Sequence, residues 1–175
     1  MSDQVNEKVL LRTSRFSVNM LEIVDANGQQ ISREVIRHPG AVVLLPQLDD
    51  GRIVLIENHR HTVGETLLEL PAGTIDPGET PEQTATRELT EETGYTAAKL
   101  EQIHEFYSCP GICDERMHLY LATELTAGEP DREATEQIEN RIVRHDEIPG
   151  LIASGAIRDA KTLVGLYALL SRFPG

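Results

Sequence analysis

Apolar and polar residues alternate along the first part of the chain in the manner of β-strands. The alternation runs through residues 8–24, and a second strand-like run covers residues 31–36. Between them, the sequence Asp-Ala-Asn-Gly at 25–28 has the composition of a tight hairpin turn. We therefore expect residues 1–37 to form a strand-rich N-terminal segment.

Three short runs rich in apolar residues follow, and they predict strands at Ala41–Leu45, Arg52–Glu57 and Leu67–Leu70. The sequence Asp-Asp-Gly at 49–51 lies between the first two runs and consists of residue types that favour turns. This spacing predicts a second hairpin, made by the first two runs.

The next segment carries the start and stop signals of a helix over Pro81–Thr93. Thr80 can cap the N-terminus, Pro81 suits the first helical position, and Gln83 completes a capping box. Gly94 is a natural C-terminal stop.

The last third of the chain continues the mixture of strands and helices. Strand patterns cover 100–107, 117–125 and 137–143, and helical patterns cover 146–154 and 160–172. Because strands outnumber helices and many are joined by turns, we expect an α/β fold in which helices flank a mixed sheet.

Composition narrows the classes of function. The 175 residues, 39% of them hydrophobic, suffice for one domain with a proper core. A net charge of −13 disfavours nucleic-acid partners, and it means that any phosphate chemistry needs bound cations and a few well-placed arginines. No run approaches the roughly 20 apolar residues of a membrane span. Cys109 and Cys113 are too few for a disulfide scaffold and match no common zinc pair, which favours a cytoplasmic protein.

Three glutamates on the predicted helix share one face. At about 100° per residue, Glu88 and Glu92 lie about 40° apart, with Glu91 about 60° to the other side. Like charges at these spacings repel each other, and the negative end of the helix dipole adds a similar penalty. A divalent cation could offset both, and oxygen ligands without nearby His or Cys favour Mg²⁺, with Mn²⁺ as a substitute. A solvated acidic face is the alternative.

The stretch around this helix matches a known motif. Gly73, Glu79 and the run Arg-Glu-Leu-Thr-Glu-Glu-Thr-Gly at 87–94 stand in the spacing of the Nudix box, with Tyr95 at a position that is usually aliphatic. So many fixed positions make a specific signal. The chain therefore resembles the Nudix hydrolases. The resemblance implies a Nudix-type α/β/α sandwich with a mixed sheet over residues 38–175, preceded by the strand-rich segment.

The same resemblance implies a role for each fixed residue on the helix. Glu88, Glu91 and Glu92 would be metal ligands, and the carbonyl of Ala72 would be a further ligand. Arg87 would orient the glutamates through ion pairs. Glu91 is in addition a reserve candidate for the catalytic base.

Residues outside the box resemble those of ADP-ribose pyrophosphatases and related sugar-nucleotide hydrolases. The segments 33–42, 57–60 and 67–73 carry this resemblance, as does Pro110, 16 residues after Gly94. The candidate substrate-binding residues are Arg37, Arg60, Glu69, Pro110 and Glu115. The two arginines are candidates for clamping the diphosphate, because a guanidinium fork matches phosphate oxygens; ordinary surface arginines are the alternative.

An acidic segment at 131–139 resembles the mobile loop that supplies the catalytic base in this subfamily. Its Glu-x-Ile-Glu ending makes Glu136 the first choice for the base and Glu133 the second. An acidic loop without a catalytic role is the alternative. Glu79 would support the loop before the helix or a metal-bound water.

The predicted function is a magnesium-dependent pyrophosphatase. It would hydrolyse the diphosphate bond of ADP-ribose or a related nucleoside diphosphate sugar, giving a nucleoside monophosphate and a sugar phosphate. One alternative is a nucleotide-sugar sensor without catalysis, but such a protein would be expected to lose box glutamates that this chain keeps. Another is a Nudix enzyme that acts on a different nucleotide. The resemblance also implies a homodimer, in which N-terminal strands from 1–37 cross to the other subunit and help to form its pocket.

Overall fold

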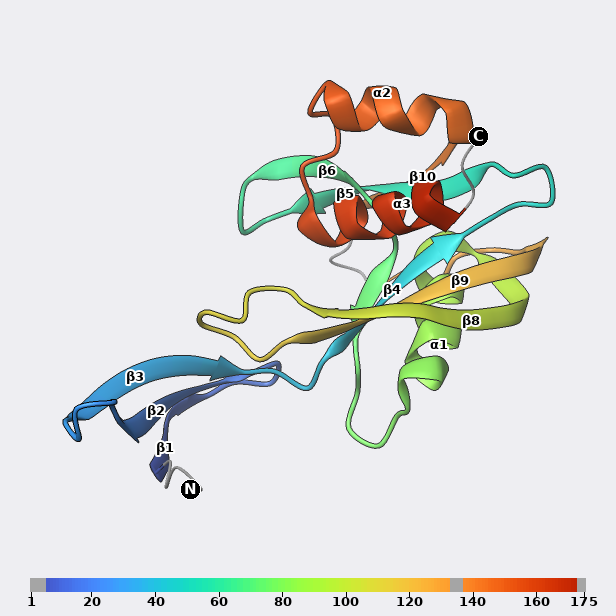
Figure 1. Cartoon of the computed structure of the whole chain (residues 1–175). Helices are drawn as coiled ribbons and strands as arrows, with labels where there is room; N and C mark the ends of the chain where they lie inside the picture. The colour runs from blue at the N-terminus through green and yellow to red at the C-terminus, as the bar shows by residue number, and fades with distance from the viewer. Residues whose placement is uncertain (1–5, 133–136, 173–175) are drawn as a thin grey trace.

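The computed structural model describes residues 6–132 and 137–172, which form three sheets and three α-helices (Figure 1). The strands are β1 (Asn6–Arg12), β2 (Ser17–Val24), β3 (Gln30–Arg37), β4 (Ala41–Pro46), β5 (Ile53–Arg60), β6 (Glu65–Glu69), β7 (Ala72–Thr74), β8 (Tyr95–Tyr107), β9 (Arg116–Ala127) and β10 (Ile138–Val143). The helices are α1 (Pro81–Thr93), α2 (Ile148–Ala153) and α3 (Ala160–Arg172), with a 3-10 turn, η1 (His145–Glu147), before α2. Within these described ranges, no helix has the length and apolar character needed to cross a membrane.

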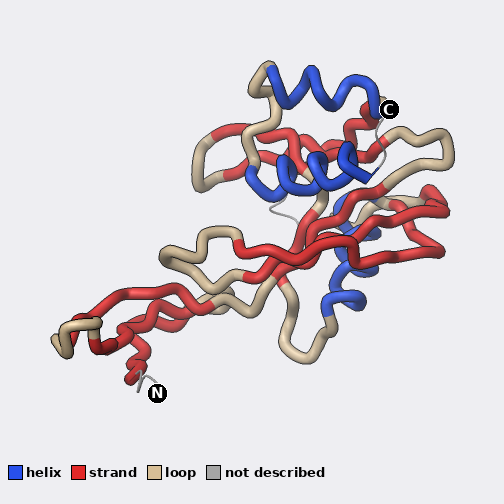
Figure 2. The backbone as a smooth tube through the Cα atoms, in the orientation of Figure 1, coloured by secondary structure: helices blue, strands red, loops and turns tan. Residues whose placement is uncertain are grey.

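The N-terminal strands β1, β2 and β3 form an antiparallel sheet of their own. This sheet is a helix-free arm that projects from the rest of the molecule (Figure 2). Two backbone hydrogen bonds tie its last strand to the loop between β8 and β9. Ile36 N donates to Ile112 O at 2.8 Å, and Asp114 N donates to Ile36 O at 3.2 Å. The strands predicted in this segment are confirmed, and the division into units 1–37 and 38–175 stays a prediction.

Strand β4 lies inside the main sheet because it is apolar on both faces. All six of its residues are buried. It pairs in parallel with β9 and antiparallel with β7, and β8 pairs with the other edge of β9, which gives the order β7-β4-β9-β8. A continuous apolar run is what burial of both faces requires. The predicted mixed sheet is therefore confirmed.

Alternate residues of β4 enter two different cores, since successive side chains of a strand point to opposite faces. Val42 and Leu44 pack with Leu89 of α1. Val43 and Leu45 pack with apolar residues from β5, β6, α2 and α3. These two cores place helices on both sides of the main sheet, and the predicted α/β/α arrangement is confirmed.

The second predicted hairpin is wrong in its pairing. The turn at 49–51 forms, with Gly51 N donating to Leu48 O and Leu48 N donating to Arg52 O, both at 2.8 Å. The flanking strands then separate, because the two edges of β4 are already paired with β7 and β9. Strand β5 pairs instead with β6 and β10 in an antiparallel second sheet. The turn-forming residues predicted the reversal of the chain correctly, but they did not predict which strands pair with β5.

Helix α1 begins and ends where the sequence predicts. Thr80 accepts a hydrogen bond from Gln83 N, the capping box is complete, and Gly94 caps the C-terminus with φ 78°. The sequence did not predict β7, because a three-residue strand inside a Gly- and Pro-rich loop has no periodicity of its own. That short strand nevertheless carries one wall of the functional site.

Candidate active site

A cavity of about 660 Å³ opens between the loop after β7 and the acidic face of α1. Strand β7 and the loop at 75–79 line one side. Helix α1 contributes Arg87, Glu88, Glu91 and Glu92. The structure thus brings the three predicted metal glutamates to one cavity, together with the predicted backbone ligand Ala72.

Arg87 is the centre of an ion-pair network in this cavity. Its Nε and Nη2 donate to the two carboxylate oxygens of Glu79, both at 3.0 Å. Its Nη1 donates to Glu88 at 2.7 Å and to Glu91 at 2.8 Å. The hydrogen bonds from Arg87 lower the pKa of Glu79 to about 2. Glu79 therefore holds Arg87 in place, and Arg87 in turn holds two of the three predicted metal ligands.

Glu92 and Gly73 bring α1 and β7 into direct contact. Glu92 is 3% exposed, and its Oε2 accepts a hydrogen bond from Ala72 N at 2.9 Å. A Cβ atom added to Gly73 would lie 1.9 Å from the carboxyl carbon of Glu88. No larger residue fits while Glu88 keeps this position. Close approach of the Glu88 side chain, rather than a positive φ, is therefore what favours glycine at position 73.

The donor set of this cavity fits a hard divalent cation. In the part of the chain that the structure describes, no three Asp, Glu, His or Cys side chains already converge as a metal-binding cluster. Arg87 donates to Glu88 and Glu91 and places a positive charge between them. The carboxylates still outnumber this guanidinium, and all the candidate ligands are oxygens, which Mg²⁺ and Mn²⁺ prefer.

A second cavity, of about 420 Å³, adjoins the first. Arg60 and residues 72–74 line both cavities. The second cavity is further lined by Glu69, Ser108, Glu115 and Lys161, among others. Arg60 therefore stands at the junction of the two cavities.

A fully buried carboxylate organises the second cavity. Glu69 accepts hydrogen bonds from Arg60 Nε at 2.9 Å, from Arg60 Nη2 at 2.6 Å and from Lys161 Nζ at 2.5 Å. The ammonium of Lys161 also lies 3.0 Å from Asp159, which accepts from Thr162 N at the start of α3. The hydrogen bonds to Glu69 raise the pKa of Arg60. Burial acts to raise the pKa of Asp159, but Lys161 and Thr162 outweigh it and the pKa is lowered. Two cations thus converge on one carboxylate.

Two of the predicted substrate-binding residues lie outside the linings of both cavities. Arg37 donates to Glu7 through Nε at 2.8 Å and through Nη2 at 3.0 Å, and to Asp114 through Nη1 at 3.1 Å. These ion pairs fasten the N-terminal sheet to the loop after β8. Pro110 is exposed in the same loop. The geometry supports a structural role for Arg37, and the predicted substrate contacts of both residues stay predictions.

The other predicted residues divide into two groups. Arg60, Glu69 and Glu115 all line the second cavity. The Oε1 atom of Glu115 lies 3.5 Å from Nδ1 of His38. Both candidates for the catalytic base, Glu133 and Glu136, lie outside the described residues.

Several cavity residues were not predicted from the sequence, among them Ser14, Arg15 and Lys161. Lys161 belongs to the helix predicted at 160–172, but no local pattern relates it to Glu69, which is 92 positions away. Ser14 and Arg15, in the turn between β1 and β2, line the first cavity of their own chain. Only the three-dimensional fold brings these residues to the site.

Comparisons with known proteins agree with this geometry. The sequence profile of the family described as NUDIX domain matches residues 36–164. The "ADP-ribose pyrophosphatase" of Bacillus subtilis (strain 168) is 38% identical over 172 residues, which cover 94% of this chain and 93% of that protein. The "Methanol dehydrogenase activator" of Bacillus methanolicus is 36% identical, with 90% of this chain and 85% of that protein covered.

A solved structure supports the fold independently. The protein described as "Crystal structure of ADP compounds hydrolase" superposes with a TM-score of 0.86 and 22% identity, covering 100% of this chain and 96% of that one. At this identity the likeness concerns the fold alone. Taken with the family profile and the full-length relatives, it confirms the resemblance given by the sequence motif, and the chain belongs to the NUDIX domain family.

Proposed function

We propose that the protein is a magnesium-dependent pyrophosphatase that hydrolyses the diphosphate bond of ADP-ribose or a related nucleoside diphosphate sugar. The products would be a nucleoside monophosphate and a sugar phosphate. The observation that carries the proposal is the junction of the two cavities at Arg60 and residues 72–74. On one side of this junction lie the glutamates of α1, and on the other lies the cluster around Glu69. A diphosphate placed at the junction would meet both.

The acidic cavity would hold the metal through Glu88, Glu91, Glu92 and the Ala72 carbonyl. When bound there, Mg²⁺ supplies charge neutralisation for the diphosphate and lowers the pKa of a coordinated water. The chain's own contribution is positional. Arg87 fixes the directions of Glu88 and Glu91, and the short contact between α1 and β7 fixes their distance from Ala72.

The cationic side of the junction would bind phosphate oxygens. Arg60 donates to Glu69 through Nε and Nη2. Its side chain is 38% exposed, so its remaining N–H groups can donate to the substrate. Lys161 shares its ammonium between Glu69 and Asp159, which leaves donor capacity on the cavity side. In this arrangement Glu69 is a positioning residue, because its carboxylate is buried and already bonded to both cations.

The second cavity would take the sugar phosphate half of the substrate. Ser108 and Glu115 line it with a hydroxyl and a carboxylate, groups that suit sugar hydroxyls. Glu115 is one of the predicted substrate-binding residues, and its position in this cavity supports contact with ribose hydroxyls.

The catalytic base stays part of the proposal, with Glu136 as first choice and Glu133 as second. A base that acts only in the transition state should affect turnover more than binding. Glu136→Gln should lower kcat by roughly 10² to 10⁴ and leave KM within a few-fold, whereas Glu133→Gln should do much less. Steady-state kinetics on the two variants would distinguish them, and the reverse result would assign the base to Glu133.

The proposed activity is tested with a panel of nucleotide sugars in the presence of Mg²⁺, with the products identified by chromatography. ADP-ribose should give AMP and ribose 5-phosphate, and adding EDTA should stop the reaction. A protein that binds these compounds but releases no product would be the sensing module. Turnover of nucleoside triphosphates alone would identify a Nudix enzyme with another substrate.

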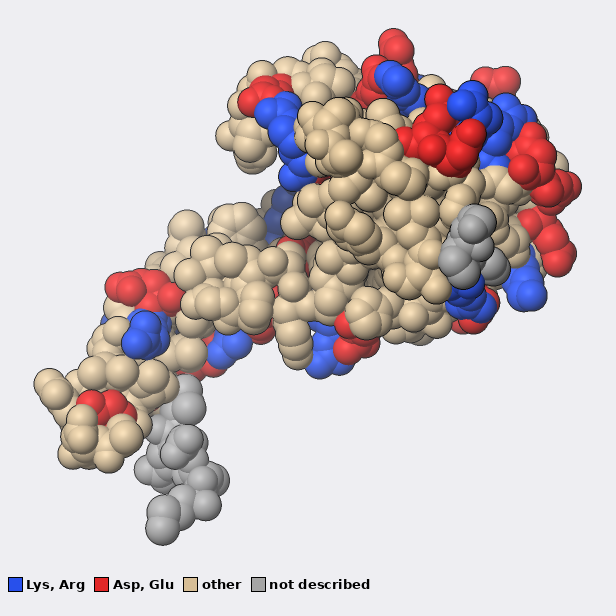
Figure 3. Space-filling model, turned by 45° about the horizontal axis from the view of Figure 1, so that its top comes forward, with Lys and Arg blue, Asp and Glu red and all other residues tan. Residues whose placement is uncertain are grey.

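We further propose a cytoplasmic homodimer without nucleic-acid partners. On the face shown in Figure 3, most basic side chains of the described residues stand beside acidic ones. The N-terminal arm exposes several large apolar side chains, namely Val9, Leu10, Leu11 and Phe16. A second subunit would cover such residues. Light scattering at micromolar concentration should give about twice 19.4 kDa, and a monomer mass would contradict the dimer.

A further inference from the structure

The C-terminal end of α1 combines three electrostatic costs. It carries Glu88, Glu91 and Glu92, and its last turn contains no basic residue. The helix dipole makes this end negative. The last carbonyl groups also lack partners within the helix. Of these carbonyls, only that of Thr90 is bonded by the cap, through Gly94 N at 2.8 Å.

The remaining carbonyls are bonded by residues far along the chain. Glu91 O accepts from Asp131 N at 3.1 Å. Glu92 O accepts from Arg132 Nε at 3.0 Å. Thr93 O accepts from Asn140 Nδ2 at 2.7 Å. The end of the acidic helix is therefore closed by residues 131–132, which follow β9, and by Asn140 of β10.

Arg132 and Asn140 act as a pair in this contact. Arg132 Nη2 donates to Asn140 Oδ1 at 3.1 Å while its Nε bonds Glu92 O. The approach is close along the whole end of the helix, since a Cβ atom on Gly94 would lie 2.7 Å from Gly128 O. Arg132 thereby supplies the positive charge that the last turn of α1 lacks. Its guanidinium bonds both Glu92 O and Asn140, and Asn140 in turn caps Thr93.

We propose that Arg132 and Asn140 are positioning residues for the metal site, an inference that rests on Glu91 and Glu92 being the ligands of the proposed function. Their hydrogen bonds end on the backbone of the turn from which these two glutamates project. Without them the turn would fray, and the carboxylates would lose the fixed directions that a hard cation requires. Replacing Arg132 or Asn140 should therefore weaken metal binding more than substrate binding.

The experiment measures Mn²⁺ binding to the full-length protein without substrate, by the loss of the free-ion electron paramagnetic resonance signal. Arg132→Ala and Asn140→Ala should each weaken Mn²⁺ binding by about tenfold, the effect typical of groups that orient metal ligands. Arg132→Lys should fall between wild type and Arg132→Ala, because it keeps the charge and loses the fork. With nucleotide sugar, kcat at limiting metal should fall while KM stays within about threefold.

Arg141→Ala is the matched control. Arg141 lies beside Asn140 on β10, is exposed, and pairs with Glu57 at 2.8 Å on the surface. The Arg141→Ala variant should bind Mn²⁺ as tightly as wild type does. Thermal unfolding in EDTA separates the two readings of the contact: lower stability in Arg132→Ala and Asn140→Ala with unchanged Mn²⁺ affinity would overturn the proposal and leave a purely structural cap.

Glu92→Gln distinguishes failure of this inference from failure of the proposed function. If Glu92→Gln binds Mn²⁺ as tightly as wild type, the metal site itself is wrongly assigned. If Glu92→Gln loses affinity while Arg132→Ala and Asn140→Ala do not, the metal site holds and the positioning role is wrong.

Discussion

Two charged clusters meet at Arg60, and they are built in opposite ways. In the cluster on α1, one guanidinium, Arg87, is shared by Glu79, Glu88 and Glu91. In the other, one carboxylate, Glu69, is shared by Arg60 and Lys161. The first therefore has acid in excess and the second presents two cations around a single acid.

The difference shows how ion pairs between the same kinds of side chain can prepare sites for ligands of opposite charge. Carboxylates in excess attract a divalent cation, and they cost the helix stability until one binds. Cations gathered by a buried carboxylate are held at fixed positions and keep donors for an anion. The shared residues also differ in burial: Glu69 is 0% exposed, whereas the side chain of Arg87 is 28% exposed.

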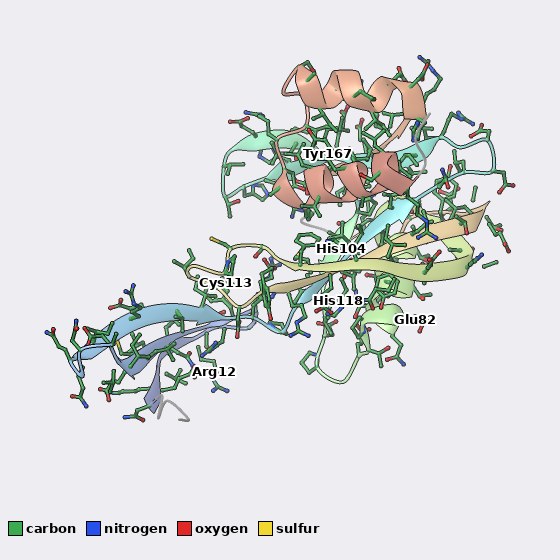
Figure 4. The ribbon with its side chains drawn as sticks, in the orientation of Figure 1. Arg12, Glu82, His104, Cys113, His118 and Tyr167 are labelled. Carbon is green, nitrogen blue, oxygen red and sulfur yellow. The ribbon has the colours of Figure 1, made fainter. Side chains whose placement is uncertain are left out.

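The largest effect should come from neutralising the acidic cluster. Glu91→Gln and Glu92→Gln should each lower turnover by at least about 100-fold at subsaturating Mg²⁺, because a metal ligand is lost. The fold should survive, since repulsion at the helix end is relieved. Glu82→Gln is the control, because Glu82 (labelled in Figure 4) is exposed and lies in the first turn of α1, outside the cavity lining. Near-normal rates in both ligand variants would make this cluster a structural network only.

A smaller effect should come from the cationic cluster. Lys161→Ala should raise KM for a nucleotide sugar by about tenfold, the worth of one charge-assisted hydrogen bond, and change kcat little. Lys161→Arg should recover part of the loss. Arg158→Ala removes a nearby exposed cation that pairs with Glu65 and should leave KM unchanged. A fall in kcat with an unchanged KM would show that Lys161 does not bind substrate.

The smallest effect concerns Glu79 and pH. The pKa of Glu79 is lowered from 4.5 to about 2, first by the hydrogen bonds from Arg87. A carboxyl group whose pKa falls on folding stabilises the protein above its unfolded pKa and loses that contribution as pH falls through the folded value. In EDTA, wild type should therefore unfold at higher denaturant concentration than Glu79→Gln at pH 7. The gap should close between about pH 4.5 and pH 2. A gap that persists at pH 2 would assign the difference to packing.

The features that the sequence predicted are those encoded by nearby residues. The boundaries of α1 follow from Thr80, Gln83 and Gly94, which act within one or two turns of the helix ends. The grouping of the glutamates follows from helical spacing alone. The fixed spacing of the box adds the family, and with it the fold.

The features that the sequence did not predict depend on residues brought together across the fold. The pairing of β5 depends on which edges β4 has left free, and Lys161 meets Glu69 only after α3 packs beside β6. The cap of α1 by Arg132 and Asn140 is similar, since its donors lie 40 and 47 positions from their acceptors. Local patterns carry no information on such partners.

Gly73 has a consequence for transplanting this site onto another scaffold. Because the carboxyl group of Glu88 occupies the space where a side chain at 73 would stand, the helix and the strand are complementary surfaces of one unit. A graft of α1 alone would present the glutamates to a foreign backbone bearing a Cβ atom at that place, and the Glu88 carboxylate would have to leave its position beside Arg87. Engineering should therefore move the residues of β7, the loop and α1 as one cassette, and libraries that vary position 73 should return glycine.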